Sequence, residues 1–149
     1  MNQIATVLDV DHIGVSVSDM GRAIRFFTAL GADVTPPYLF DDPKIGVTTG
    51  IAGAKIEICQ ATLHGKNFEL LRYDDPAGRQ AQNHRPCDPG HMHIGLLVRD
   101  IEGMTGRLRE HGFEPAAPVQ AGLGGSNRSA NYCYGFDGLV VELIEVPEA

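Results

Sequence analysis

The sequence predicts an α+β fold of one domain, built from two similar halves. The first observation behind this prediction is an internal repeat, because the His-Ile-Gly segment at residues 12–14 recurs at residues 93–95. The second is a later echo, in which Phe-Glu-Leu-Leu at 68–71 corresponds to Val-Glu-Leu-Ile at 141–144. Both echoes keep their order along the chain. Each half is therefore expected to contain the same succession of a strand, a helix and further strands.

The first half opens with a strand and a helix. In the strand expected over residues 7–17, the apolar residues from Ile13 to Val17 alternate with polar or small ones, which is the period of a strand buried on one face. Asp19 is a suitable N-cap for the helix that follows, and Gly31 is a suitable end for it.

The second half repeats this opening. A strand is expected over residues 93–98, Asp100 is the expected N-cap, and Gly112 ends the helix. Gly103 and Gly106 weaken this helix by about 1 kcal/mol each relative to Ala, so packing of its apolar face must hold it.

The remaining elements follow from apolar runs and turn residues. Further strands are expected over residues 54–61, 67–73, 129–134 and 139–146. Asp137-Gly138 predicts a hairpin turn between the last two of these strands. Residues 41–51 fit either a short helix or a loop. The domain over residues 1–149 is expected to consist of a module at 1–80, a connector at 81–90 and a module at 91–149.

Composition and charge exclude several classes of protein. The chain has 149 residues and a formal net charge of −7, and it contains no basic run, which argues against a nucleic-acid partner. No apolar run approaches the roughly 20 residues that span a bilayer, and the N-terminus lacks the pattern of a signal peptide. Its three cysteines form neither a disulfide framework nor a zinc motif. A cytoplasmic setting, without a membrane partner, is the expectation.

Strand alternation predicts one shared site. In each half, the helix must cover the apolar face of the sheet, so His12 and His93 lie on the opposite face. The same parity separates Glu69 and Glu142 from their apolar neighbours. Two sheets related by a pseudo-twofold axis would bring these four residues into one cleft. Two imidazoles and two carboxylates form a nitrogen and oxygen site suited to Zn, Ni, Co, Mn or Fe(II).

These residues resemble the vicinal oxygen chelate superfamily, also called the glyoxalase/bleomycin-resistance/dioxygenase fold. The resemblance covers nearly the whole chain, from the strand and helix after Asp11 to the final Val-Glu-Leu. It implies paired βαβββ modules that form a half-barrel around a metal ion. By similarity to the glyoxalase I-like and methylmalonyl-CoA epimerase-like branches, the metal ligands are His12, Glu69, His93 and Glu142. His91 lies on the same face of its strand and is the rival to His93 as a ligand. His93 is preferred because it matches His12 in the repeat, which leaves His91 to contact either a metal ligand or the substrate.

The number of carboxylates discriminates among reactions of this superfamily. A carboxylate at both Glu69 and Glu142 resembles the isomerase, lyase and epimerase branch, in which the ion acts as a Lewis acid on a small carbonyl substrate and stabilises an enolate or enediolate. The base is left open. By resemblance to the glyoxalases it is Glu69 or Glu142, and by resemblance to the epimerases it is Glu57 on the preceding strand.

Substrate-binding candidates come from the second hairpin and from two arginines. An even number of loop residues would place Asn131 and Cys133 on the face of Glu142, whereas an odd number would reverse them. Arg128 follows a flexible Gly-Gly-Ser-Asn segment, and either Arg128 or Arg72 can bind a substrate carboxylate or phosphate.

Other functions of this fold are kept as alternatives. They are an Fe(II) extradiol-type dioxygenase, a thiol transferase of the fosfomycin-resistance type, and a drug- or ligand-binding protein that needs no metal. A homodimer is expected, because proteins of this fold usually assemble further.

Overall fold

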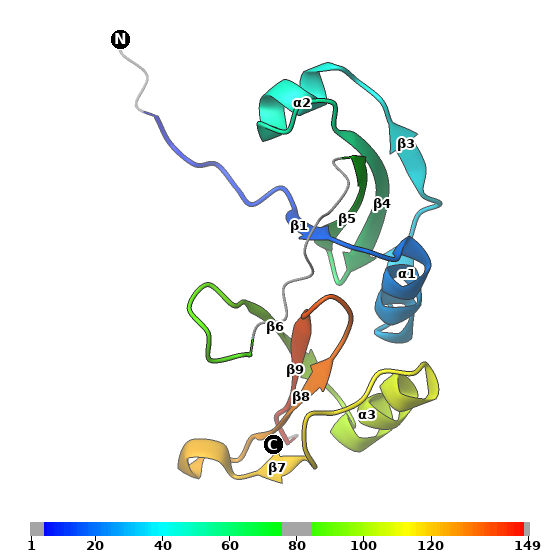
Figure 1. Cartoon of the computed structure of the whole chain (residues 1–149). Coiled ribbons are helices and arrows are strands. Elements are labelled where there is room, and N and C mark those ends of the chain that lie inside the picture. The colour runs from blue at the N-terminus through cyan, green and yellow to red at the C-terminus, as the bar shows by residue number, and fades with distance from the viewer. Residues whose placement is uncertain (1–4, 76–84, 148–149) are drawn as a thin grey trace.

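Two similar modules, each a sheet with one covering helix, make up the computed structural model, which describes residues 5–75 and 85–147 (Figure 1). The first sheet has the strand order β1-β5-β4-β2, and β3 pairs with β4 in addition. The second sheet has the order β6-β9-β8-β7. The equivalent orders confirm the predicted α+β fold with two tandem modules. Of the predicted connector over 81–90, residues 81–84 lie outside the described residues.

The first module contains five strands and two helices. In chain order they are β1 (Ile13–Ser16), α1 (Met20–Ala29), β2 (Asp33–Val34), β3 (Tyr38–Phe40), α2 (Lys44–Thr49), β4 (Lys55–Leu63) and β5 (Lys66–Asp75). Of the two alternatives for residues 41–51, the short helix is therefore correct. The two short strands between α1 and α2 were not anticipated from the sequence.

The second module has the same layout with shorter connections. Its elements are β6 (His93–Val98), α3 (Ile101–Glu110), β7 (Gln120–Ala121), the 3₁₀ turn η1 (Leu123–Gly125), β8 (Ser129–Tyr134) and β9 (Val140–Glu145). In both modules the first strand runs parallel to the last, and the last two long strands form an antiparallel hairpin.

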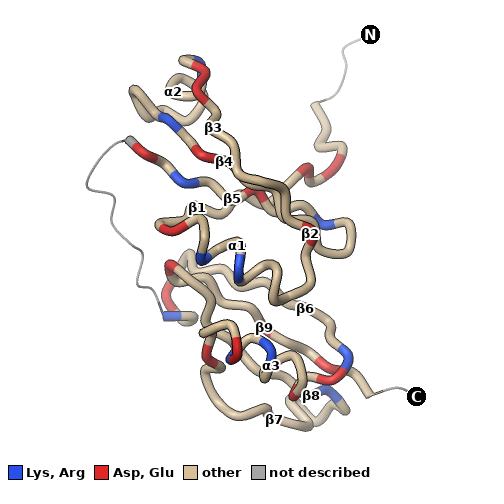
Figure 2. The backbone as a smooth tube through the Cα atoms, turned by 90° about the vertical axis from the view of Figure 1, so that its right-hand side faces the viewer, with Lys and Arg blue, Asp and Glu red and all other residues tan. Residues whose placement is uncertain are grey.

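The first strand is shorter than the alternation predicted. It was expected over residues 7–17, but β1 begins at Ile13, where its pairing with Phe68 of β5 begins. Residues 5–12 are exposed and form no strand. In Figures 1 and 2 this segment runs away from the body of the molecule. Alternating residues there have no neighbouring strand to complete a ladder, so the pattern alone does not produce a strand.

Both long helices begin at the predicted caps. The Asp19 carboxylate accepts a hydrogen bond from the backbone N–H of Arg22, and Asp100 does the same for Gly103. Asp100 adopts a positive φ of 63°, which brings its carboxylate so close that a Cβ at position 103 would overlap it. Gly103, a poor helix former, is therefore explained by the geometry of the cap.

One aromatic cluster joins the two modules. Phe26 of α1 is fully buried, and its ring lies 4.8 Å from that of Phe113 and 5.6 Å from that of Phe136, in edge-to-face contacts. The helices α1 and α3 lie on the same side of the molecule, against the sheet faces that they cover (Figure 1). Nearby, the Asp137 carboxylate accepts hydrogen bonds from the backbone and hydroxyl of Ser18 at 2.7 and 2.6 Å. The modules thus share one core.

Among the described residues, no helix is both long and apolar enough to cross a membrane.

We predict that Phe26→Ala destabilises both modules together. The change removes a fully buried ring that contacts aromatic residues of both modules, so the free energy of unfolding should fall by about 3–5 kcal/mol. Urea unfolding followed by circular dichroism measures this. Phe40→Ala, at an exposed strand position, is the control and should cost far less. A small loss for Phe26→Ala, or separate transitions in the wild-type protein, would contradict a shared core.

Candidate metal-binding site

The first His–Glu pair lies at the start of the first sheet. Phe68 and Leu70 of β5 are buried against α1, and the alternation between them turns Glu69 to the other face. His12, just before β1, is on that face too. Its Nε2 atom lies 3.4 Å from Oε2 of Glu69. The predicted parity of both residues is therefore correct.

Two neighbours that the sequence analysis missed hold this pair in place. Asp11 accepts a hydrogen bond from Nδ1 of His12 at 2.7 Å, and the Gln60 amide donates one to Oε1 of Glu69 at 2.8 Å. Gln60 could have been found only from the register of β4 and β5, which places it opposite Glu69. Asp11 was visible as the residue before His12, but no pattern marked it as a partner.

The Asp11 contact affects the protonation of His12. The hydrogen bond from the imidazole to Asp11 raises the pKa of His12 above its ordinary value, and the charge of Glu69 raises it further. In the neutral ring, a proton on Nδ1 is directed at Asp11, which leaves the lone pair of Nε2 facing Glu69. This is the tautomer that a metal-ligating histidine needs.

The second pair repeats the first within the second sheet. Nε2 of His93 lies 3.3 Å from Oε2 of Glu142, on the face opposite the buried Val141 and Leu143. Gly95 lies opposite Glu142 in the register of β6 and β9, as Gly14 lies opposite Glu69 in the first sheet. A Cβ at Gly95 would lie 4.0 Å from the Glu142 carboxylate. The repeated His-Ile-Gly segment thus places a glycine beside the glutamate in each sheet.

Tyr132 lies beside the second pair, and its position decides between the two alternatives for the second hairpin. Five residues separate β8 from β9, an odd number, so Tyr132 rather than Asn131 or Cys133 lies on the face of Glu142. Its ring centroid is 5.2 Å from that of His93. Asn131 and Cys133 are buried on the helix-covered face, where burial raises the pKa of the Cys133 thiol to about 11. They are therefore not placed to bind substrate.

Glu57 and Arg72 are also placed away from the pairs. They lie opposite one another in β4 and β5, three positions from Gln60 and Glu69, and therefore on the other face of the sheet. The Arg72 guanidinium binds Glu57 at 2.8 Å and Asp74 at 2.7 Å. The turn that decides this face consists of His64 and Gly65, both with positive φ. The expectations of a base at Glu57 and a substrate contact at Arg72 are not supported.

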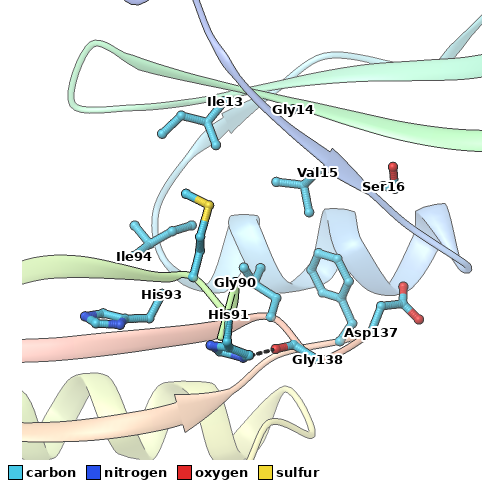
Figure 3. Close-up of a pocket in the computed structure, with 13 residues that line it drawn as sticks. Ile13, Gly14, Val15, Ser16, Gly90, His91, His93, Ile94, Asp137 and Gly138 are labelled. Atoms are coloured by element: carbon cyan, nitrogen blue, oxygen red, sulfur yellow. Dashed lines mark hydrogen bonds between the residues drawn. The ribbon is translucent and has the colours of Figure 1, made fainter. Parts of the chain in front are cut away.

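His91 and Arg128 do not join either pair. Nε2 of His91 lies 3.1 Å from the Gly138 carbonyl, at a cavity of about 570 Å³ between the two modules. Figure 3 shows Ile13 and Val15 of β1 on one side of this cavity and His91 on the other. Arg128 is exposed and precedes β8. In the described part of the chain, its side chain makes no hydrogen bond or ion pair with either His–Glu pair.

The four predicted ligands form two pairs rather than one cluster within this chain. Among residues 5–75 and 85–147, no three His, Cys, Asp or Glu side chains lie close enough together to hold one metal ion. The parity argument is correct within each sheet. The further prediction, that all four residues share one cleft, is not correct for a single chain. The two sheets do not bring their His–Glu faces together.

Each pair nevertheless fits half of a metal site. Two ligand atoms that share an ion at about 2.0–2.2 Å are themselves roughly 3–3.5 Å apart, which is the separation of nitrogen and oxygen in both pairs. The donors are one imidazole nitrogen and one carboxylate oxygen, a set suited to Zn and to Mn, Fe, Co or Ni. Both histidines are partly exposed, at 41% and 42% of their side-chain area, so an ion and further ligands can reach them.

Comparison with known families identifies the fold. A family model described as the glyoxalase/bleomycin resistance protein/dioxygenase superfamily matches residues 11–134. The chain belongs to this superfamily, as the resemblance of its motifs indicated. No match was found among curated proteins.

Solved structures share the fold over nearly the whole chain. A glyoxalase family protein from Bacillus cereus is 24% identical with a TM-score of 0.84, covering 97% of each chain. A glyoxylase/bleomycin resistance protein/dioxygenase domain from Frankia is 17% identical with a TM-score of 0.68, covering 97% of this chain and 96% of its own. The fosfomycin resistance protein FosX from Listeria monocytogenes, solved with Mn(II) and sulfate, is 16% identical with a TM-score of 0.60 and 95% coverage of both chains.

We predict that Asp11→Asn lowers the pKa of His12. The raised pKa depends first on the hydrogen bond to the Asp11 carboxylate, so a neutral amide should return it toward the ordinary value. Titration of the His12 ring by NMR in metal-free protein measures the midpoint. Because a metal ion competes with the proton, metal binding by the wild-type protein should weaken as the pH falls through this raised pKa. Asp9→Asn is the control and should leave the midpoint in place. An unchanged midpoint in Asp11→Asn would contradict the assigned cause.

Proposed function

We propose that this protein is a metal-dependent isomerase, epimerase or lyase that acts on a small carbonyl substrate, with its site completed by two copies of the chain. The observation that carries the proposal is the duplicated His–Glu pair, exposed on equivalent faces of the two sheets. A half-buried carboxylate on a largely apolar strand is costly to desolvate, and each of these two is kept beside a histidine at an equivalent position, which indicates a shared use. When bound, the ion supplies a Lewis acid for the carbonyl oxygens of the substrate and stabilises enolate or enediolate charge.

A second copy explains why the pairs are apart in one chain. Both β1 and β6 are edge strands, and each has a histidine at or just before its first residue. Apolar side chains remain exposed beside these edges, including Ile13, Met92 and Leu97. If the β1 edge of one copy lies beside the β6 edge of another, His12 and Glu69 meet the partner's His93 and the partner's Glu142. A twofold dimer then contains two such sites.

The two carboxylates have different surroundings, and this suggests different roles. Glu69 is held by Gln60 through its second oxygen and is suited to remain a ligand. Glu142 contacts His93, and within the described residues no hydrogen bond restrains its other oxygen. Glu142 is therefore the acid more free to turn toward a substrate and take the proton next to its carbonyl group. Tyr132, on the same face, supplies a phenol that can donate to a substrate oxygen.

A second candidate function is a binding protein without catalysis. The observation in its favour is that, within residues 5–75 and 85–147, the ligating side chains of one chain gather as pairs and not in groups of three. Such a protein would use the exposed sheet faces to hold a ligand and would not need a metal ion. The experiments below separate the two functions.

We predict that metal binding shows complementation between two inactive variants. His12→Ala and His93→Ala should each lose metal, since each removes one donor from every site. In a random mixture of the two, half of the dimers contain both chains, and each of these has one intact site out of two. Metal content should recover to about a quarter of the wild-type value of about one ion per chain.

The measurement is metal analysis after equilibration of the unfolded and refolded mixture with Zn, Ni, Co, Mn or Fe(II) under reducing conditions. No recovery on mixing would place both pairs of a site in one chain. Absence of metal from the wild-type protein with all five ions would contradict the metal site itself and favour the binding protein.

We predict that Glu142→Gln abolishes proton exchange on a substrate. An amide can still offer an oxygen to a metal ion but cannot accept the proton, so exchange with solvent deuterium should fall by about 100-fold or more. A panel of α-hydroxyketones, hemithioacetals and acyl thioesters is incubated in D₂O and followed by NMR. Glu57→Gln is the matched control, because Glu57 lies on the opposite sheet face, and it should retain exchange. Loss of exchange only in Glu57→Gln would reverse the assignment of the base.

A further inference from the structure

The N-terminal arm, residues 5–11, has apolar side chains that are not buried within its own module. Val7 is 85% exposed and Leu8 95% exposed, and Val10 is also largely exposed. Exposed apolar residues in such a short extended segment point to a contact with another surface. Asp9 and Asp11 give the same segment two negative charges.

A groove of matching character lies between the modules. It has a volume of about 640 Å³ and runs along β6 from Ile94 to Arg99. Its apolar walls come from the residue after α1 and from β4, β5, β6 and α3, and they include Leu30, Leu63, Phe68, Leu96, Val98 and Met104. Two cationic residues, Lys66 and Arg99, also line it, together with His64. An acidic arm with apolar side chains is complementary to an apolar groove with basic residues along it.

The arm of the same chain is not directed into this groove. Ile13 lines the groove, and the arm leaves the body immediately before it (Figure 2). The exit is fixed by two contacts: the Asn67 amide donates to the backbone carbonyl of Asp11, and Asp11 binds the His12 ring. To enter its own groove, the chain would have to reverse at Asp11 and His12 and break these contacts.

We propose that the N-terminal arm of one copy occupies the groove along β6 of a second copy. This inference rests on the two-copy site proposed above and adds to it the contact that holds the copies together. Leu97 and Gly95 line the groove, and Gly95 adjoins the Glu142 carboxylate. The arm leads directly into His12. An arm bound in this groove therefore brings His12 toward the partner's Glu142, so the arm contact also positions one of the metal ligands.

A matched pair of valines tests the arm. Val7 in the arm and Val47 in α2 are both 85% exposed. Val7→Lys places a positive charge in an apolar groove that already carries Lys66 and Arg99, and it should raise the dimer dissociation constant by about tenfold or more, as Leu8→Lys should. Val47→Lys should leave it unchanged. Sedimentation equilibrium of the full chain measures this. Dimerisation of the arm variants equal to that of the wild-type protein would overturn the proposal, as would a monomeric wild-type protein.

Cross-linking tests which copy's groove is used. In a background with the exposed Cys87 changed to Ser, Leu8→Cys is mixed with Leu97→Cys and oxidised. A disulfide-linked dimer of one chain of each kind is expected. A mixture of Val47→Cys with Leu97→Cys should give none. Failure to form the mixed dimer, or an intrachain link without a dimer in a chain carrying both cysteines, would overturn the proposal.

The two proposals fail in different ways. Recovery of metal in the mixture of His12→Ala and His93→Ala, combined with normal dimerisation of Val7→Lys, would reject the arm contact and keep the two-copy site. The mixed disulfide without any recovery of metal would keep the arm contact and reject the two-copy site.

Discussion

Burial of one face of each sheet beneath its helix is the constraint on which the rest of the structure depends. Phe68 and Leu70 are buried against α1, as Val141 and Leu143 are buried on the covered face of the second sheet. Because side chains alternate along a strand, each intervening glutamate must turn to the uncovered face. The first strand of each module runs parallel to the last and brings its histidine to the same face. The His–Glu pairs therefore follow from packing and strand alternation together.

The two pairs are alike in their first contacts and different in their surroundings. In the first pair, Asp11 binds His12 and Gln60 binds Glu69. In the second pair, Met92 is the residue before His93, and Tyr132 lies beside the His93 ring. A site formed from one of each pair would combine a firmly held carboxylate with a freer one. The firmly held carboxylate would then be suited to binding the ion, and the freer one to transferring a proton.

Contacts between the two modules decide which surfaces remain available to a second chain. The cluster around Phe26 and the contact between Ser18 and Asp137 hold the two modules of one chain together on the helix side. Within residues 5–75 and 85–147, this packing leaves the outer edges of β1 and β6 without a paired strand, and it leaves the arm before β1 exposed. Unpaired edges and an exposed apolar segment are features that association with another chain would cover. The same packing that makes one core thus keeps the pairs apart within one chain.

The sequence alone determined the repeat, the caps at Asp19 and Asp100, and the face on which each histidine and glutamate lies. These features depend on residues close in sequence, where the periods of strands and helices act directly. Only the tertiary structure decided the face of Glu57, which depends on a two-residue turn, and that of Tyr132, which depends on a loop of odd length. It also decided that residues 5–12 form no strand and that the pairs stay separate. Register and the placement of one sheet against another are set by contacts between distant segments, which alternation along a single strand does not encode.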